Sequence, residues 1–345
     1  MTITKEKFGK TKSGADVDIY TITNKLGSAL KLITYGAVIQ SMITKDVDGN
    51  PVDVLLGFET IEEYETNGGS HGATIGRFAN RINHGKFTLN SKTYNIPLRN
   101  DVYALHGGDE GFGEKVWDAE VDGDSVKMTY FSEDGEEGFP GNLTTTVKFS
   151  LTDENELIID YAATTDADTV LNLTNHSYFN LNGSGNAMDH ILKINSDKIA
   201  EVDNNAIPYG NYLDVAGTPM DFNTPAVISE KLDNEFIQIK NCGGYDHSYH
   251  LADDDSLKDI GYLFSDKTKI KMSMKTTEVA VQFYAGNFIG DLKGKNGVQY
   301  FNNSGLCFET QHHPDSPNKP EFPSTVLKAG ETFTSTTIYK FELEK

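Results

Sequence analysis

Alternation of apolar and polar residues with a period of two dominates this sequence and restricts the folds open to it. The longest example, residues 29–42, is rich in β-branched residues and is interrupted by Gly36, which is typical of a strand that bends or turns. Further alternating runs lie at residues 191–194, 270–274, 279–284 and 333–343. Because successive side chains of a strand point to opposite faces, these runs predict strands with one buried face.

Short polar turns join neighbouring runs in pairs, as β-hairpins require. The predicted hairpins are 86–89 with 92–96, 117–121 with 125–131, and 145–151 with 156–162. Helical patterns are scarce, and residues 61–64 are the best short candidate. With 16 Tyr, 19 Phe and 32 Gly, the chain is predicted to be mostly β, a large antiparallel sandwich or closed barrel with few short helices. A parallel βαβ arrangement is not supported, because no amphipathic helix alternates with the strands.

Length and composition set further bounds. The 345 residues contain no linker, low-complexity tract or repeat, so we expect residues 1–345 to form one domain. The two cysteines, Cys242 and Cys307, are too few for a disulfide framework, and each is predicted to be a buried free thiol. The N-terminus has no apolar signal segment and no stretch is apolar enough for a membrane span, so we expect a cytoplasmic protein. A net charge of −21 argues against nucleic-acid binding.

Glu309 is the residue that most needs a functional explanation. It is the one charged residue of the run 304–311, and Leu306-Cys307-Phe308 before it is predicted to be a buried strand. A carboxylate on such a strand is costly to bury unless it has a partner or a chemical role. The two histidines that follow, His312 and His313, are interpreted as structural residues at the strand exit, because Pro314 ends the ladder.

Known cofactor motifs are absent, whereas polar segments punctuate the strands. The sequence contains no glycine-rich dinucleotide fingerprint, phosphate-binding loop, His-Glu-x-x-His or Cys-x-x-Cys motif, so a nucleotide cofactor and a zincin site are disfavoured. The polar segments are residues 76–82, 105–108, 175–181 and 243–247. Together with Glu309 they supply carboxylates, imidazoles, an arginine and amides, a set suited to proton transfer on a polyhydroxylated substrate. At ordinary pKa values of about 4.3 for Glu and 6.5 for His, a base and a partly protonated acid coexist near neutrality, and a nearby carboxylate favours the imidazolium.

Each of these signals also has a structural explanation. A histidine beside glycine, as at His106, is often a satisfied structural residue, and Asn175-His176 can be a hydrogen-bonding cluster at a strand end. Arg77 and Arg81 can form structural ion pairs, and Asp246 can form an Asx-turn.

A metal site is the other alternative. Its possible ligands are His106, His176, His247, His312, His313, Asp246 and Glu309. A two-His-one-carboxylate zinc or iron site could be assembled from them, but no two histidines stand at His-x-His or His-x-x-x-His spacing. We therefore expect no metal.

The polar segments, taken in order, resemble the galactose mutarotase or aldose 1-epimerase family. The matching motifs are Gly76-Arg77-Phe78-Ala79-Asn80-Arg81-Ile82, Leu105-His106-Gly107-Gly108, Asn175-His176-Ser177-Tyr178-Phe179-Asn180-Leu181, Tyr245-Asp246-His247 and Phe308-Glu309-Thr310-Gln311. The resemblance extends over about residues 15–340, and the segments 314–318 and 322–327 are also similar.

The resemblance implies a fold, an activity and a set of site residues. The fold is a galactose mutarotase-like supersandwich with an open sugar cleft and no cofactor. The activity is that of an isomerase, interconverting the α and β anomers of free aldohexoses such as D-galactose and D-glucose by acid/base ring opening and closure. Glu309 is expected to be the general base and His176 the general acid. The substrate-binding residues are expected to be Asn80, Arg81, His106, Tyr178, Asp246, Gln282 and Tyr284.

The partner implied is a monosaccharide, bound by a monomer or a homodimer. Two other functions stay open at this stage. Epimerisation of a hexose 6-phosphate would need a phosphate clamp, and no basic cluster is apparent beyond Arg77, Arg81 and Arg99. A carbohydrate-binding protein without catalysis would use the same cleft but would need neither a base nor an acid.

Overall fold

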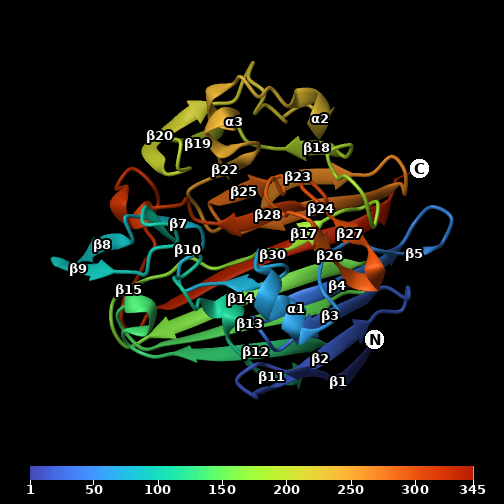
Figure 1. Ribbon diagram of the computed structural model, residues 1–345, viewed down its shortest axis with the longest axis horizontal. Helices are drawn as coiled ribbons and strands as arrows, with labels where there is room; N and C mark the ends of the chain where they lie inside the picture. Colours follow the sequence, from blue (N-terminus) through green and yellow to red (C-terminus); the bar gives the residue numbers. More distant parts are fainter. Residues whose placement is uncertain (345) are drawn as a thin grey trace.

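The computed structural model describes residues 1–344, and 46% of the chain is strand and 8% helix. The prediction of a mostly β, antiparallel protein is therefore confirmed. Among these residues the α-helices are α1 (Ile61–Asn67), α2 (Ile228–Lys231) and α3 (Ile237–Cys242), and four short 3-10 helices account for the rest of the helical fraction. Figure 1 shows broad sheets stacked across the molecule, with α2 and α3 at one end and both termini on the same side.

A five-stranded sheet is formed by the N-terminal segment in simple sequence order. Its strands are β1 (Thr2–Lys10), β2 (Asp16–Thr23), β3 (Ala29–Ile33), β4 (Val38–Lys45) and β5 (Pro51–Asp53). The long run 29–42 thus becomes a hairpin, as its central glycine suggested. Gly36 has a φ of 64°, and a Cβ there would lie 2.3 Å from the carbonyl oxygen of Gly113, so only glycine fits this turn.

A nine-stranded sheet runs through the middle of the molecule in the order β11-β12-β13-β14-β30-β24-β23-β18-β21. The strands are β11 (Asp118–Asp122), β12 (Ser125–Ser132), β13 (Leu143–Leu151), β14 (Glu156–Thr165), β18 (Ile191–Ile194), β21 (Ala226–Val227), β23 (Lys258–Phe264), β24 (Ile270–Thr276) and β30 (Thr332–Leu343). The C-terminal β30 lies between β14 and β24, so the sheet joins the two halves of the chain.

A six-stranded sheet in the order β17-β28-β25-β22-β19-β20 carries much of the cleft described below. Its strands are β17 (Tyr178–Phe179), β19 (Lys198–Val202), β20 (Pro208–Asp214), β22 (Asp246–His250), β25 (Ala280–Tyr284) and β28 (Leu306–Gln311). The remaining strands form two-stranded pairs: β6 (Thr74–Ile75) with β16 (Thr174–Asn175), β7 (Arg81–Asn83) with β10 (Tyr103–Leu105), β8 (Lys86–Leu89) with β9 (Lys92–Asn95), β15 (Thr169–Val170) with β29 (Val326–Leu327), and β26 (Leu292–Lys293) with β27 (Gln299–Tyr300).

The local predictions are confirmed in detail. The three predicted hairpins are β8/β9, β11/β12 and β13/β14. The predicted helix at 61–64 is the first turn of α1, where Thr60 and Glu63 form a capping box. Cys242 and Cys307 are both buried free thiols. Within the described chain, no helix is both long and apolar enough to cross a membrane.

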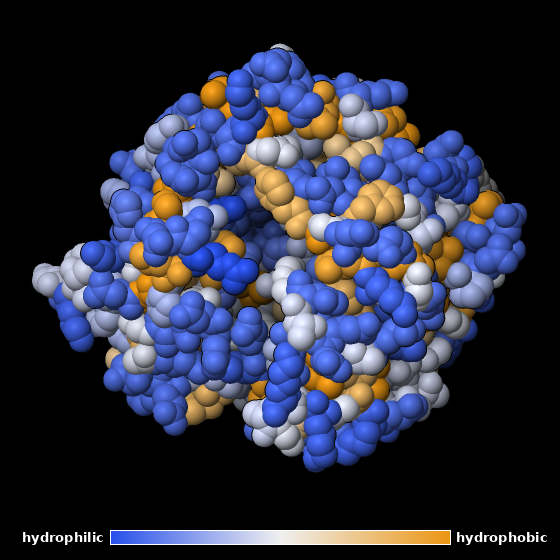
Figure 2. Space-filling view, in the orientation of Figure 1, coloured by the Kyte–Doolittle hydropathy of each residue, from blue (hydrophilic) through white to orange (hydrophobic). Residues whose placement is uncertain are grey.

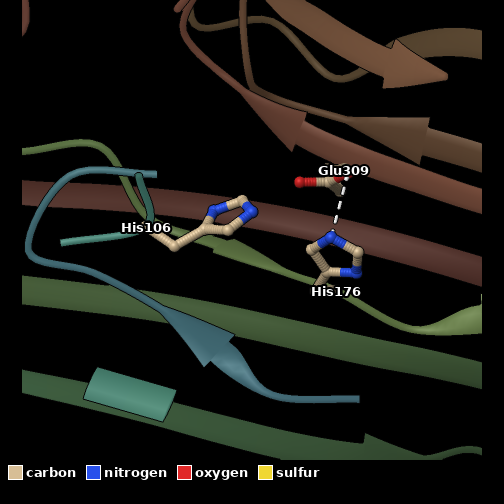
Figure 3. A group of neighbouring side chains, drawn as sticks. All are labelled: His106, His176 and Glu309. Carbon is tan, nitrogen blue, oxygen red and sulfur yellow. Dashed lines mark ion pairs between the residues drawn. The ribbon is translucent and has the colours of Figure 1, made fainter. Parts of the chain in front are cut away.

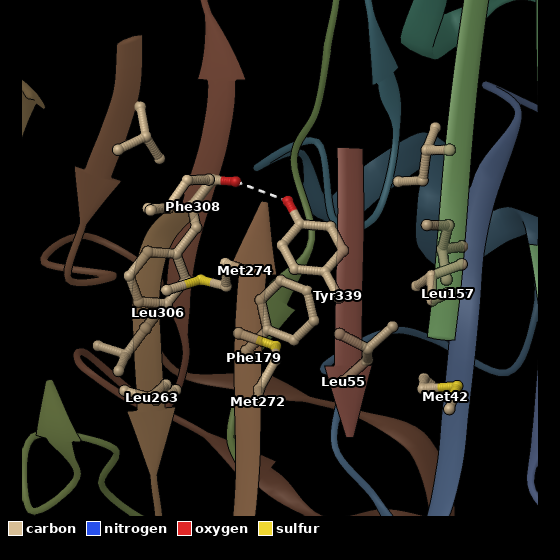
Figure 4. Close-up of a cluster of buried hydrophobic side chains, with 14 of the residues drawn as sticks. Met42, Leu55, Leu157, Phe179, Leu263, Met272, Met274, Leu306, Phe308 and Tyr339 are labelled. Atoms are coloured by element: carbon tan, nitrogen blue, oxygen red, sulfur yellow. Dashed lines mark hydrogen bonds between the residues drawn. The ribbon is translucent and has the colours of Figure 1, made fainter. Parts of the chain in front are cut away.

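The main hydrophobic core lies between the sheets and includes side chains from all three (Figure 4). Phe308 of β28 packs there with Phe179, and the hydroxyl of Tyr339 on β30 donates a hydrogen bond of 2.7 Å to the carbonyl of Phe308. Because side chains alternate along a strand, Glu309 must point to the opposite face of the six-stranded sheet. The core thus fixes the backbone next to the carboxylate that the sequence singled out.

Arg77 is structural, but the predicted ion pair is wrong. Its buried guanidinium donates hydrogen bonds of 2.8 Å to the backbone carbonyls of Pro140 and Gly141. These partners are carbonyl dipoles of a loop distant in sequence, which no local pattern could reveal.

Candidate active site

A cleft of about 380 Å³ opens on the face of the molecule shown in Figure 2, where a hydrophilic hollow lies near the middle. Eight of the nine predicted site residues line it. These are Asn80, Arg81, His106, His176, Tyr178, Asp246, Tyr284 and Glu309. The structure therefore brings together residues separated by up to 229 positions in the chain (309 − 80).

The six-stranded sheet supplies part of the cleft through its strand register. Asp246, Tyr284, Cys307 and Tyr178 stand opposite one another on four adjacent strands. Gln282 and Glu309 form the next cross-strand pair on the same face, two residues along β25 and β28. One face of the sheet thus presents a row of polar and aromatic groups, while the other face contributes Phe308 to the core.

The β7/β10 pair supplies the opposing arginine and histidine. Leu105 is paired with Arg81, so His106 follows directly beside Asn80. Asn80 and His106 have left-handed φ values of 64° and 53°, and they bond to each other. The N–H of His106 donates to the carbonyl of Asn80 at 3.0 Å, and the N–H of Asn80 donates to Nδ1 of His106 at 3.2 Å. Since Nδ1 accepts a hydrogen bond, the ring proton of His106 lies on Nε2.

His176 and Glu309 form the centre of the cleft. His176 follows β16, and its N–H is held by the carbonyl of Ala73 at 2.9 Å. Its Nε2 lies 3.6 Å from Oε1 of Glu309, and both side chains are buried. Figure 3 shows His106 pointing toward this pair from the other side of the cleft. The arrangement can move a proton between the imidazole, the carboxylate and a molecule placed among them.

Burial changes the protonation expected for this pair. It raises the pKa of Glu309 well above its ordinary value, with a further contribution from the charge of Asp246, and it lowers the pKa of His176 to about 4. Both changes run against the ordinary pKa values from which a carboxylate beside a partly protonated imidazole was expected. Desolvation penalises both charges, so burial favours the neutral form of each group.

Asp246 is held from two directions. The guanidinium of Arg81 donates to its Oδ2 at 3.2 Å, and the amide of Gln282 donates to its Oδ1 at 2.6 Å. Although burial lowers the pKa of Arg81, the charge of Asp246 raises it above its ordinary value, so Arg81 stays charged. Gln282 is buried on the same sheet face as Glu309, and it reaches the cleft through Asp246, since Gln282 itself is not among the residues that line the cleft.

Three of the possible metal ligands converge. Nitrogen or oxygen atoms of His106, His176 and Glu309 all lie within 4.8 Å of one another. His106 does not fit such a site, because its Nδ1 already accepts from Asn80 and its Nε2 therefore offers a proton in place of a lone pair. The donor set fits a hydroxyl-bearing ligand better than a cation.

The other histidines of the metal alternative have structural partners outside the cleft. Nε2 of His247 lies 3.1 Å from the carbonyl oxygen of Gln238, and Nδ1 of His312 lies 2.9 Å from Oε2 of Glu278. His313 is buried, with its Nδ1 2.8 Å from the hydroxyl of Ser248. The expected structural role of His312 and His313 agrees with these contacts.

The sequence profile of the aldose 1-epimerase family matches residues 18–340. The chain belongs to the aldose 1-epimerase family. Its enzymatic activity is that of an aldose 1-epimerase, an isomerase acting on a sugar.

Relatives match over nearly the whole length of this family member. It is 38% identical to galactose mutarotase of Mus musculus, with 99% of each chain covered, and 36% identical to aldose 1-epimerase of Escherichia coli K12, with 96% and 97% covered. Among solved structures, it superimposes on a GalM/aldose epimerase homologue from C. elegans with a TM-score of 0.88 at 31% identity, covering 94% of this chain and 98% of the other. A galactose 1-epimerase from Lactobacillus acidophilus NCFM gives a TM-score of 0.86 at 29% identity, with 100% and 99% covered.

Several residues that line the cleft of this aldose 1-epimerase were missed by sequence reasoning. The clearest is His71, which is buried and whose ring stacks on Tyr178 at a centroid distance of 4.5 Å. The others include Tyr35, Tyr64, Arg99, Tyr103 and Phe288. His71 lies in a glycine-rich loop after α1, and nothing in its neighbourhood distinguishes it from a surface histidine.

Proposed function

We propose that the protein interconverts the α and β anomers of free aldohexoses, D-galactose and D-glucose among them. The observation that carries the proposal is the 3.6 Å approach of His176 Nε2 to Glu309 Oε1 inside a polar cleft. The full-length relatives named galactose mutarotase support galactose as a substrate.

In the proposed reaction, Glu309 acts as base and His176 as acid. The carboxylate of Glu309 takes the proton of the anomeric hydroxyl, and Nε2 of the imidazolium gives a proton to the ring oxygen as the C1–O5 bond breaks. The sugar is then an open-chain aldehyde, and Glu309 is protonated while His176 is neutral. Rotation about C1–C2 presents the other face of the aldehyde, and closure returns both protons with the roles reversed.

The electrostatics of the buried pair fit this cycle. Its two charge states are an ion pair, which accompanies the closed sugar, and a neutral pair, which accompanies the open one. Burial favours the neutral pair, as the opposite directions of the two pKa changes indicate. Burial therefore favours the transfer of both protons once the ion pair and the closed sugar meet, and each positioned acid or base contributes about 10² to 10⁴ in rate.

The sugar-holding groups that we propose are those around the pair. Arg81 and Asp246 present a guanidinium and a carboxylate to the ring hydroxyls, and His106 presents an Nε2–H donor. Asn80 and the rings of Tyr178 and Tyr284 complete the contacts. These groups orient the ring while C1 turns.

We further propose a monomer or homodimer in the cytoplasm. Two free, buried thiols fit a reducing compartment.

Polarimetry tests the proposed function. Fresh α-D-galactose and α-D-glucose are followed with and without protein, and acceleration over buffer is expected, unchanged by a chelator. A rate equal to that of buffer, together with sugar binding in calorimetry, would replace the proposal by that of a binding protein. A parallel arm with hexose 6-phosphates tests the phosphorylated substrates, for which slower reaction is expected.

A further inference from the structure

The cleft face of β28 carries two side chains that reach His176. Cys307 and Glu309 stand two residues apart, so they share one face of the strand. Oε1 of Glu309 lies 3.6 Å from Nε2 of His176, and Sγ of Cys307 lies 3.5 Å from Nδ1. One strand therefore holds both nitrogens of the imidazole.

We propose that Cys307 is a positioning residue whose sulfur accepts a hydrogen bond from Nδ1–H of His176 and so leaves Nε2 as the nitrogen that gives and takes the proton. The inference rests on the proposed function and deepens it. In the cycle above, Nε2 gains and loses a proton while Nδ1 must keep its own in both states. A group that accepts from Nδ1 selects that tautomer.

The groups around His176 indicate that Cys307 is the side chain that accepts from Nδ1–H. Among residues 1–344, Cys307 is the one side chain within hydrogen-bond distance of Nδ1, and the backbone of His176 itself also contacts the ring. The other groups that face His176 are the carboxylates of Glu309 and Asp246 and the rings of His106, Tyr178 and Tyr284.

The protonation states expected for Cys307 and His176 agree with the contact between Sγ and Nδ1. Burial raises the pKa of the Cys307 thiol well above its ordinary value, so the sulfur stays uncharged and acts as a weak acceptor. Burial also disfavours the charged forms of both neighbours, because it raises the pKa of Glu309 and lowers that of His176. The contact between Sγ and Nδ1 then holds the single proton of the neutral imidazole on Nδ1, toward the sulfur.

Histidine NMR tests the tautomer without reference to activity. The intact protein is labelled with ¹⁵N-histidine, and the His176 signals are assigned by their loss in His176→Asn. A proton on Nδ1 in the wild type, and a mixture of tautomers in Cys307→Ala, are expected. A bare Nδ1 with the proton on Nε2 would overturn the proposal.

Kinetics test the consequence for catalysis. Cys307→Ala is expected to lower kcat about tenfold with little change in KM, the rate equivalent of one ordinary hydrogen bond. Cys307→Ser, which restores an acceptor, is expected to recover part of the loss. Equal kcat values for wild type and Cys307→Ala would reject the positioning role.

The chain contains its own matched control. Cys242 is also buried and its Sγ lies 3.6 Å from Nε2 of His247, outside the cleft lining. Cys242→Ala removes an equivalent contact and should leave kcat unchanged. If wild-type protein fails to accelerate mutarotation, the proposed function falls, while the NMR result still decides the tautomer.

Discussion

Glu309 combines a buried position with an incomplete set of partners. Its side chain is 2% exposed, and its Oε2 has no hydrogen-bond partner among the described residues. An unpaired buried oxygen is costly, and in an enzyme such a cost is tolerated where the group meets a substrate. At this scale, stability and catalysis make opposite demands on one side chain.

Replacing Glu309 by glutamine should separate the two demands. Glu309→Gln keeps the shape but removes the base, so kcat is expected to fall by about 10² to 10⁴, while the melting temperature stays the same or rises. Polarimetry and thermal unfolding measure the two effects. The control is Glu278→Gln, another buried glutamate, which pairs with His312 outside the cleft and should lose stability but keep activity. Wild-type turnover in Glu309→Gln would contradict the assignment.

At the scale of elements, the register between paired strands brings residues that are distant in sequence into one site. β22, β25 and β28 are neighbours, so residues 246, 282 and 309 meet although they are far apart in the chain. Gln282 contributes to the site by donating a hydrogen bond to Asp246. β30 acts similarly from the core side, because its Tyr339 holds the carbonyl of Phe308, next to Glu309.

Removing the amide of Gln282 should affect binding more than turnover. In Gln282→Leu, Asp246 keeps its ion pair with Arg81 but loses the hydrogen bond of 2.6 Å from the Gln282 amide. Because Asp246 is then held from one side, KM for galactose is expected to rise about tenfold. The control is Gln311→Leu. Gln311 is also buried on β28 but has no hydrogen-bond partner within residues 1–344, so its loss should leave KM near wild type. An unchanged KM in Gln282→Leu would show that Arg81 alone positions Asp246.

The hydroxyl of Tyr339 should contribute to stability. Tyr339→Phe leaves the buried carbonyl of Phe308 without this donor, which costs about 1–3 kcal/mol in the free energy of unfolding. Urea unfolding measures the difference. Tyr161→Phe is the matched control, because the hydroxyl of Tyr161 is buried without a partner and its removal should be neutral or stabilising. Equal losses in both variants would argue against the hydrogen bond.

At the scale of the whole molecule, the sheets tie distant parts of the chain together. β14 pairs with β30 over residues 156–164 and 332–340, and β24 pairs with the other edge of β30. We propose on this basis that the chain is one domain. The same packing buries many ionisable groups, so stability depends on pH through residues outside the cleft.

His313 offers a test of that dependence. Burial, with the neighbouring His250 and His312, lowers its pKa to about 3. The native state therefore keeps His313 neutral, whereas the unfolded state binds a proton below about pH 6.5. Between these values the unfolded state holds more protons, so acidification destabilises the fold by up to about 1.4 kcal/mol per pH unit for this group.

In His313→Gln, this contribution should disappear. Urea unfolding is followed between about pH 7 and pH 5, and the loss of stability on acidification is expected to be smaller in the variant than in the wild type. His84→Gln, at an exposed histidine, is the control and should keep the wild-type slope. Parallel slopes for wild type and His313→Gln would show that His313 does not titrate as burial requires.

The sequence by itself determined the local structure and the candidate chemistry. Alternation and turn residues indicated hairpins such as β3/β4 and β8/β9, and Glu309 stood out because a lone carboxylate in an uncharged strand is costly. Tertiary structure alone decided which groups the site residues contact and how burial changes their pKa values. Arg77 donates to backbone carbonyls, Gln282 donates to Asp246, and Cys307 contacts His176, because strand register and layer packing set these distances. The pKa values of Glu309 and His176 likewise depend on what covers them, which only the folded chain specifies.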